Sequence, residues 1–366
     1  MADSEHSPDI NFLGPLLHDL FVIDAVYRHG RRIVVTMSYR YERQRTNKLF
    51  RERLRLSGYS FTLHESDEHL TLTIDPRRRF RIPVVNLVLF VLTLFSVYFV
   101  PVFFKSQAGA ATWSEVMDRT LGALGRGAGL EFTLAMISIL FVHEMGHFAA
   151  SRRRGIVTSW PYFIPAPNII GTFGAIIKSK SPFWNRRDLI EVGAAGPIAG
   201  WVVAIAWLIY GLSRSVILPS ELVPIDQLAF SLEGESLLMR FLVPIFVGSA
   251  PPGSFYVFTE AAFAGWVGLL VTAMNLLPVG QFDGGHIVYG LTMRRQKVLG
   301  WIAMIGLLAM GFGSPVWWVF AAFGFIFGVA HPPTMDDRRA TSPTARAMGI
   351  AAMVILLISF TPVPFR

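Results

Sequence analysis

The sequence contains no cysteine, and few of its 366 residues carry a charge. Without cysteine there can be no disulfide and no thiolate-bound metal, so any transition metal would need histidine and carboxylate ligands. Charged residues make up 16% of the chain and hydrophobic residues 52%, with a mean hydropathy of +0.47. Soluble domains carry about 25% charged residues. The composition therefore predicts a multi-pass membrane protein whose surroundings are a lipid bilayer.

The chain also begins without a recognisable targeting signal. Its first ten residues are acidic and precede no apolar core, which fits neither a secretion signal nor an arginine-rich transit peptide. The net charge of +8 does not indicate nucleic acid binding. In a membrane protein an excess of lysine and arginine marks cytoplasmic loops. We therefore expect no nucleic acid partner.

Residues 1–80 are predicted to form a small soluble α+β domain. Strand-like alternation occurs at 32–39, 59–65 and 69–76, and residues 43–58 form a basic amphipathic helix, which gives the order β-α-β-β. A folding or docking module is the simpler interpretation, although the arginine-rich helix could equally lie on anionic lipid. Nothing in this region identifies a partner.

The remainder is predicted to be an all-α membrane region of about seven transmembrane helices. A helix needs about 20 apolar residues to cross a bilayer. Segment 298–333 is interrupted at 311–315 by glycine, serine and proline, so we interpret it as a hairpin of two short helices. The predicted spans are 82–104, 130–151, 192–212, 261–282, the two helices within 298–333, and 347–364.

The distribution of charge supports this count. If the N-terminal domain is cytoplasmic, odd spans run outward, and basic clusters such as Arg152–Arg154 and Arg294–Arg295 fall inside. The outside segments hold few basic residues and several acids. Segment 213–260 is then an extracytoplasmic loop, in which 237–247 could form a short interfacial helix. A cell (inner) membrane is the expected location.

One uncharged stretch, 155–180, does not qualify as a span. It contains Pro161, Pro165 and Pro167, which no straight helix tolerates. Irregular backbone at membrane depth is permitted where it is buried in protein or lines a cavity. We therefore predict a re-entrant loop with a β-hairpin, in which 172–177 is strand-like.

The chemistry is concentrated in the pentad that begins at His143. His143 and His147 lie four residues apart, so on a helix both imidazoles face the same side. Glu144 can reach a water at that point without itself binding the metal. This is the H-E-x-x-H pattern of zinc metallopeptidases, here within an apolar segment where charge is costly unless it is functional. The alternative is a pair of core histidines.

A catalytic zinc needs a third protein ligand. Asp283 follows an uncharged span that ends at the same side of the membrane as the histidine span, which makes it the favoured ligand. A helix-ending Asx turn before Gly284 is the alternative interpretation. His286 competes for the third position but ranks below Asp283.

Two further features lie near this site in the sequence. Asn275 could hydrogen-bond a substrate backbone or a developing oxyanion, or equally make an interhelical hydrogen bond. Gly193, Gly196 and Gly200 place small residues along the third span. Close helix packing accounts for them, so we predict no chemistry there.

Taken together, these motifs resemble the site-2 protease family of intramembrane metalloproteases, peptidase family M50. The resemblance is carried by the zinc pentad, by Asn275-x-x-Pro278-x-x-x-x-Asp283-Gly284, and by GAAGPIAG at 193–200. It is strongest toward the branch typified by the plant chloroplast ethylene-dependent gravitropism-deficient and yellow-green proteins. No segment resembles a PDZ domain.

The resemblance implies a zinc metalloendopeptidase with one zinc ion per chain. The ligands would be His143, His147 and Asp283, and Glu144 would be the catalytic base. The substrates would be transmembrane proteins cleaved in regulated intramembrane proteolysis, with the loop near Gly171 and Gly174 helping to bind the unwound substrate.

Two other classes of function remain as alternatives. A zinc transporter would also place histidine and aspartate within spans, but it would need ligands at both faces to form a path. A non-catalytic membrane chaperone on a protease fold would typically have lost Glu144 or a histidine, and all are present.

Overall fold

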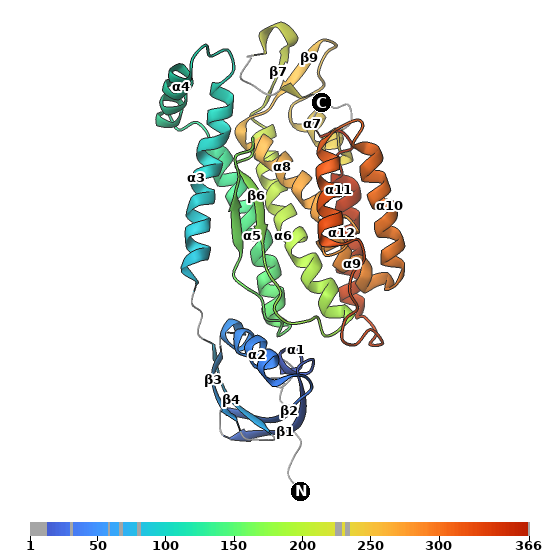
Figure 1. Cartoon of the computed structure of the whole chain (residues 1–366). Helices are drawn as coiled ribbons and strands as arrows, with labels where there is room; N and C mark the ends of the chain where they lie inside the picture. The colour runs from blue at the N-terminus through green and yellow to red at the C-terminus, as the bar shows by residue number, and fades with distance from the viewer. Residues whose placement is uncertain are drawn as a thin grey trace.

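A computed structural model describes residues 13–29, 32–57, 59–65, 69–78, 82–223, 229–230 and 235–364. The chain forms an elongated helical bundle with a small sheet-containing unit at one end, as Figure 1 shows. The two parts meet at the end of the bundle that includes Arg152 and Lys180. The mostly helical character and the small N-terminal α+β unit agree with the sequence prediction.

The N-terminal unit is an antiparallel sheet covered on one face by a helix. Its strand order is β1-β2-β4-β3. Phe50 and Leu54 of the covering helix are fully buried and pack with sheet residues such as Val35, Leu72 and Ile74. The elements are α1 (Leu13–Leu17), β1 (Phe21–His29), β2 (Arg32–Tyr39), α2 (Arg43–Ser57), β3 (Tyr59–Glu65) and β4 (Leu70–Arg78).

The predicted order β-α-β-β was incomplete. β2, α2, β3 and β4 lie within a residue or two of the predicted segments, but α1 and β1 precede them. β1 pairs with β2 through a register shift between Ile23 and Ala25. This irregularity, together with Asp24 inside the strand, weakens the alternation by which a strand is recognised.

The bundle is built around α6 (Arg186–Leu212), which packs against α5, α8, α9 and α12. Close approach requires glycine: a Cβ at Gly265 of α8 would meet the backbone of Leu208 at 2.6 Å. The other helices are α3 (Val84–Ser106), α4 (Trp113–Gly125), α5 (Leu130–Arg153), α7 (Leu237–Phe246), α8 (Glu260–Asn275), α9 (Asp283–Thr292), α10 (Arg295–Met310), α11 (Val316–Phe327) and α12 (Pro343–Ser359).

Several helix starts follow from their capping residues. Asn185, Thr259 and Ser342 each sit just before a helix with extended backbone, and each side chain accepts a hydrogen bond from the third backbone N–H that follows. This contact satisfies one of the donors that every helix N-terminus leaves without an intrahelical partner. The starts of α6, α8 and α12 are thus fixed locally.

Within the described residues, three helices are long and apolar enough to cross a membrane by length and composition: α3, α5 and α6. They match the predicted spans at 82–104, 130–151 and 192–212. α11 and α12 are apolar but shorter. The larger count of seven remains a prediction.

The helix predicted over 261–282 is wrong at its end. α8 stops at Asn275, an irregular segment containing Pro278 follows, and Asp283 is the first residue of a new helix, α9. Pro278 explains the break because it lacks a backbone N–H and cannot continue a helix. The consequence is that Asp283 lies on a short separate helix rather than at the end of a long one.

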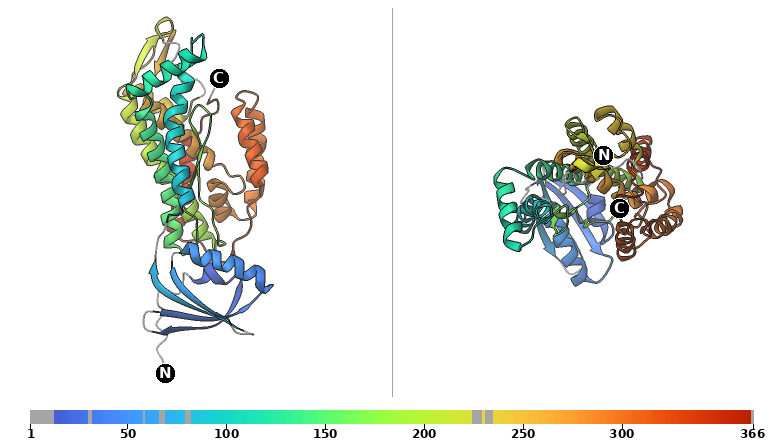
Figure 2. Two further views of the ribbon diagram at one scale, coloured as in Figure 1. Left: turned by 60° about the vertical axis from the view of Figure 1, so that its left-hand side comes forward. Right: turned by 90° about the horizontal axis from the view of Figure 1, so that it is seen from above.

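The stretch between α5 and α6 contains a hairpin, as predicted. β5 (Tyr162–Pro165) pairs antiparallel with β6 (Thr172–Ile176) and packs along α3, as Figure 2 shows from a second side. At the other end of the bundle, β7 (Val216–Pro219), β8 (Ala229–Phe230) and β9 (Ser254–Val257) form a sheet of order β7-β9-β8. The sequence did not predict this third sheet.

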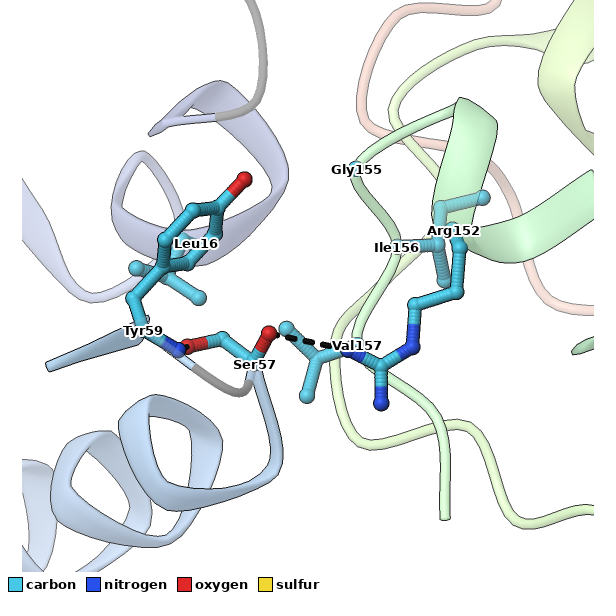
Figure 3. A pocket seen from close by; sticks show the side chains of 7 residues that line it. All are labelled: Leu16, Ser57, Tyr59, Arg152, Gly155, Ile156 and Val157. Atoms are coloured by element: carbon cyan, nitrogen blue, oxygen red, sulfur yellow. Dashed lines mark hydrogen bonds between the residues drawn. The ribbon is translucent and has the colours of Figure 1, made fainter. Parts of the chain in front are cut away.

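The N-terminal unit is joined to the bundle by specific contacts. The Arg152 guanidinium at the end of α5 donates to the carbonyl oxygens of Leu56 and Ser57 at 3.1 and 2.8 Å. Figure 3 shows Arg152 reaching across a pocket toward Ser57. On the other side, Glu52 pairs with Lys180 at 2.6 Å. α2 is therefore tied to both ends of the segment that carries the hairpin.

Candidate metal centre

Two imidazoles from one helix meet at the centre of the site. His143 and His147 lie one turn apart on α5, and their Nε2 atoms are 3.1 Å from each other. Both side chains are buried, with 4% and 8% of the residue exposed. The predicted convergence of the two rings is therefore present.

Asp283 completes the group from a different element. Its Oδ2 lies 3.2 Å from Nε2 of His147 and 3.4 Å from Nε2 of His143. Of the described residues, these three form a group of candidate metal ligands whose atoms all lie within 4.8 Å of one another. Asp283 therefore lies beside the two histidines, where the predicted third ligand would have to be.

The donor set and its spacing fit a zinc ion. Two imidazole nitrogens and one carboxylate oxygen are a ligand set of catalytic zinc sites. Ligands held tetrahedrally at about 2.0–2.1 Å from zinc lie about 3.3 Å from one another. The three donor–donor separations here, 3.1, 3.2 and 3.4 Å, are close to that value. The side chains need little movement to share one ion.

α6 orients His147. Nδ1–H of His147 donates to the backbone carbonyl of Val192 at 2.8 Å. This bond fixes the tautomer, because a proton on Nδ1 leaves the lone pair of Nε2 directed at the site. Metal-binding histidines commonly use their second nitrogen in this way.

The glycines of α6 also make room for the two rings. A Cβ at Gly196 would overlap the imidazole of His147, and one at Gly200 would lie 2.9 Å from Cβ of His143. Helix packing was the only role expected of these glycines from the sequence, and that expectation missed their contact with the candidate ligands. The signal was available in the spacing, since Gly196 and Gly200 repeat the four-residue step of the two histidines.

Glu144 lies next to His143 and is also buried, with 5% exposed. Its carboxylate is not one of the three grouped candidate ligands. It therefore remains available for a water or a substrate group.

Asn275, the last residue of α8, reaches the same centre. Its Nδ2 is 3.5 Å from Nε2 of His143. The contact is at the limit of hydrogen-bond distance. The amide donor of Asn275 therefore lies beside the candidate ligands, and its contact is with a side chain of another helix.

His286 does not join the group. Its Nδ1 lies 2.6 Å from Nε2 of His331, so the two imidazoles pair with each other. His331 is in turn held by Gln296, whose Oε1 accepts from its backbone N–H. The structure thus places Asp283, and not His286, beside the two histidines.

The hairpin contains both glycines predicted to help bind substrate. Gly171 and Gly174 adopt φ values of +80° and +93°. A Cβ at Gly171 would lie 2.6 Å from the carbonyl oxygen of Ser96 in α3, whereas one at Gly174 would meet nothing within 4 Å. Phe173 between them is 66% exposed. Gly171 is thus a packing residue against α3, and the Gly174 side of β6 is open.

Comparison with known proteins adds independent information. Residues 131–312 match the model of peptidase family M50. Over 247 residues the chain is 31% identical to the probable zinc metalloprotease EGY2, chloroplastic, of Arabidopsis thaliana, covering 65% of this chain and 42% of that protein. No solved structure matches significantly.

Two further relatives give a similar result. The EGY2 protein of Oryza sativa subsp. indica is 31% identical over 65% of this chain and 43% of its own length. The EGY1 protein of Arabidopsis thaliana is 30% identical over 64% of this chain and 43% of its own length. The chain thus spans less than half of the curated relatives it matches. The matched region contains the pentad, the glycines of α6 and Asp283, and the chain belongs to peptidase family M50.

Proposed function

We propose that the chain is an intramembrane zinc metalloendopeptidase that hydrolyses peptide bonds of membrane-embedded substrate helices. The observation that carries the proposal is the buried group of His143, His147 and Asp283 with Glu144 next to it. The names of the relatives as probable zinc metalloproteases support it. Regulated proteolysis of transmembrane proteins is the biological role we infer.

The two histidines and Asp283 would hold the zinc ion, one per chain. Zinc bound there supplies Lewis acidity, which lowers the pKa of water to about 7 and stabilises negative charge on a carbonyl oxygen. Glu144 accepts the proton of the attacking water on its carboxylate and returns it to the leaving amine nitrogen. The side-chain amide of Asn275 donates a hydrogen bond to the developing oxyanion.

The substrate must unwind before it can react. A helix hides its carbonyl groups in internal hydrogen bonds, so a local extended segment is needed. β6 is paired only with β5 in the described two-stranded sheet, so its other backbone edge can receive such a segment by β-strand addition. Gly174 adds no side chain to the face of the strand, and exposed Phe173 and Ile176 offer apolar contacts.

We further propose a topology of seven spans in a cell (inner) membrane, with the N-terminal unit in the cytoplasm. The support is the clustering of exposed basic residues at the end of the bundle that carries this unit, for example Arg153 and Lys297. The metal centre then lies toward the cytoplasmic side. Segments 1–80, 155–180 and 213–260 are the cytoplasmic domain, the re-entrant loop and the extracytoplasmic loop.

The test uses the full chain in proteoliposomes. We expect one zinc ion per purified chain, and cleavage of a membrane-tethered peptide that stops when a chelator is added and returns with zinc. A zinc-loaded chain that cleaves no membrane-tethered peptide would contradict the proposal. Zinc flux into the vesicles would favour a transporter instead, although the described residues contain one candidate ligand group rather than a path of several.

A further inference from the structure

α2 of the N-terminal unit is strongly basic on one side. It contains six arginine or lysine residues and a single acid, Glu52. Its buried side, which includes Phe50 and Leu54, packs on the sheet. Four exposed cations repeat at steps of three and four residues and therefore share the opposite side of the helix. They are Arg45, Lys48, Arg51 and Arg55.

These four cations are not neutralised within the protein. Among the described residues, none of them takes part in an ion pair. The other charged groups of α2 are used elsewhere, because Arg43 pairs with Glu65 and Arg53 with Asp19. Glu52, the only acid in the helix, pairs with Lys180 of the bundle. Within the part of the chain that the structure describes, the basic side thus has no acidic group paired with it.

The helix also lies at the level where a membrane would end. In Figures 1 and 2, α2 lies between the sheet and the bundle and runs across the long axis of the bundle. At this end α3 begins with Val84, which is 74% exposed. α10 begins with exposed Arg295 and Lys297 and continues with exposed Val298 and Ile302. Such a change from basic to apolar surface marks the boundary between headgroups and hydrocarbon.

We propose that the basic side of α2, formed by Arg45, Lys48, Arg51 and Arg55, binds the anionic headgroups of membrane lipids. The contacts of Glu52 and Arg53 with Lys180 hold the C-terminal half of α2 under the bundle. The N-terminal half extends beyond this anchor, beneath the surrounding lipid. The proposal does not depend on peptidase activity, only on insertion of the bundle in a membrane.

The expected strength follows from the surface potential of an anionic leaflet. Each lysine or arginine close to such a surface contributes about 1 kcal/mol, which is about a fivefold change in local enrichment of anionic lipid. Neutralising one cation should therefore lower that enrichment about fivefold. Because the interaction is electrostatic, added salt should weaken it as well.

Because the sequence has no cysteine, a single introduced cysteine can be labelled at a chosen position. A fluorophore on Gln44→Cys, at the exposed start of α2, is placed in the full chain in nanodiscs of mixed phosphatidylcholine and phosphatidylglycerol. A quencher is then attached to the headgroup of either lipid. We expect stronger quenching by labelled phosphatidylglycerol than by labelled phosphatidylcholine, and a smaller difference in Lys48→Gln and Arg51→Gln and at high salt.

Arg32→Gln is the matched control, since Arg32 is an exposed cation of the same unit on the sheet. It should leave the preference for phosphatidylglycerol unchanged. Equal quenching by the two lipids would overturn the proposal, as would an equal effect of Arg32→Gln and Lys48→Gln, which would indicate only a net-charge effect. No quenching by either lipid would place α2 away from the membrane and leave its basic side to an acidic soluble partner.

Discussion

At the scale of single residues, Glu144 separates metal binding from proton transfer. Its carboxylate is buried beside the candidate ligands without belonging to them. Glu144→Gln keeps the shape of the side chain and removes its basicity. We expect zinc content to stay unchanged while cleavage of a membrane-tethered peptide falls by about 10²- to 10⁴-fold, the usual contribution of a general base. Full activity of this variant would remove Glu144 from the mechanism.

Gly196 is the second residue whose role can be isolated. Gly196→Ala would push a methyl group into the ring of His147, displacing a ligand while leaving all three ligand residues in the sequence. We expect the variant to lose zinc on purification. Gly306→Ala is the control, because a Cβ there meets nothing within 4 Å and alanine favours a helix by about 1 kcal/mol. Normal zinc content in Gly196→Ala would show that α6 tolerates the methyl group by moving.

These residues also mark what the sequence could reveal. The pairing of His143 with His147 follows from helical period, and Asp283 follows from the side at which its segment ends. The four-residue spacing of Gly196 and Gly200 hints at a contact with the two histidines, but whether these glycines face α5 depends on the rotation of α6 about its own axis. That rotation is set by the side chains that pack between the two helices, and the sequence alone does not reveal which side chains those are.

At the scale of elements, the hairpin allows two nearby glycines, Gly171 and Gly174, to be compared. Gly171 and Gly174 both have positive φ, so alanine at either costs about 1–2 kcal/mol in backbone conformation. Only Gly171→Ala also collides with α3. We expect Gly171→Ala to lower the thermal stability of the full chain clearly more than Gly174→Ala. Equal melting temperatures would mean that the hairpin does not pack on α3 through Gly171.

A half-buried acid, Glu235, links the segment between α6 and α8 to the bundle. Glu235 accepts a hydrogen bond from Nε1–H of Trp266 at 3.0 Å, and burial raises the pKa of Glu235 to about 7. The pKa of Glu235 in the folded state exceeds its unfolded value of 4.5, so folding is favoured while the side chain is protonated. This contribution to the free energy of unfolding is fully present below about pH 4.5 and is lost as the pH rises through 7. We expect Glu235→Gln to be more stable than the parent at pH 8, by about 2–3 kcal/mol, and nearly equal at pH 4.5. Thermal unfolding at the two pH values measures this; a gap that does not change with pH would contradict it.

The elements differ in how readily they could be predicted. α3, α5 and α6 are long uncharged runs, for which length and hydropathy suffice. α9 was missed because it is short and opens with Asp283-Gly284-Gly285, residues that usually disfavour a helix. Its helical form depends on tertiary contact with α6: a Cβ at Gly193 would lie 3.0 Å from Cβ of His286. Packing, rather than intrinsic propensity, decides such a segment.

At the scale of the whole molecule, the N-terminal unit is hydrogen-bonded directly to α5, the helix that carries His143 and His147. Arg152 lies five residues beyond His147 on α5, and its guanidinium binds the two carbonyl oxygens that end α2. A cation is favoured there, because the C-terminus of a helix carries partial negative charge. The position of the N-terminal unit therefore bears on the end of the helix that supplies both histidines.

Arg152→Gln tests this connection, with its exposed neighbour Arg153→Gln as the control. Hydrogen bonds from a charged donor contribute about 1.5–3 kcal/mol, and loss of the contact should destabilise the docked arrangement by about that amount. Hydrogen exchange of the full chain in nanodiscs should then show faster exchange at the C-terminal turns of α2 and α5 in Arg152→Gln but not in Arg153→Gln. If the two variants exchange alike, the contact of Arg152 does not hold the N-terminal unit. The unit would then be held by Glu52, Arg53 and lipid. Any effect of its position on the metal centre would pass through the hairpin segment rather than through α5.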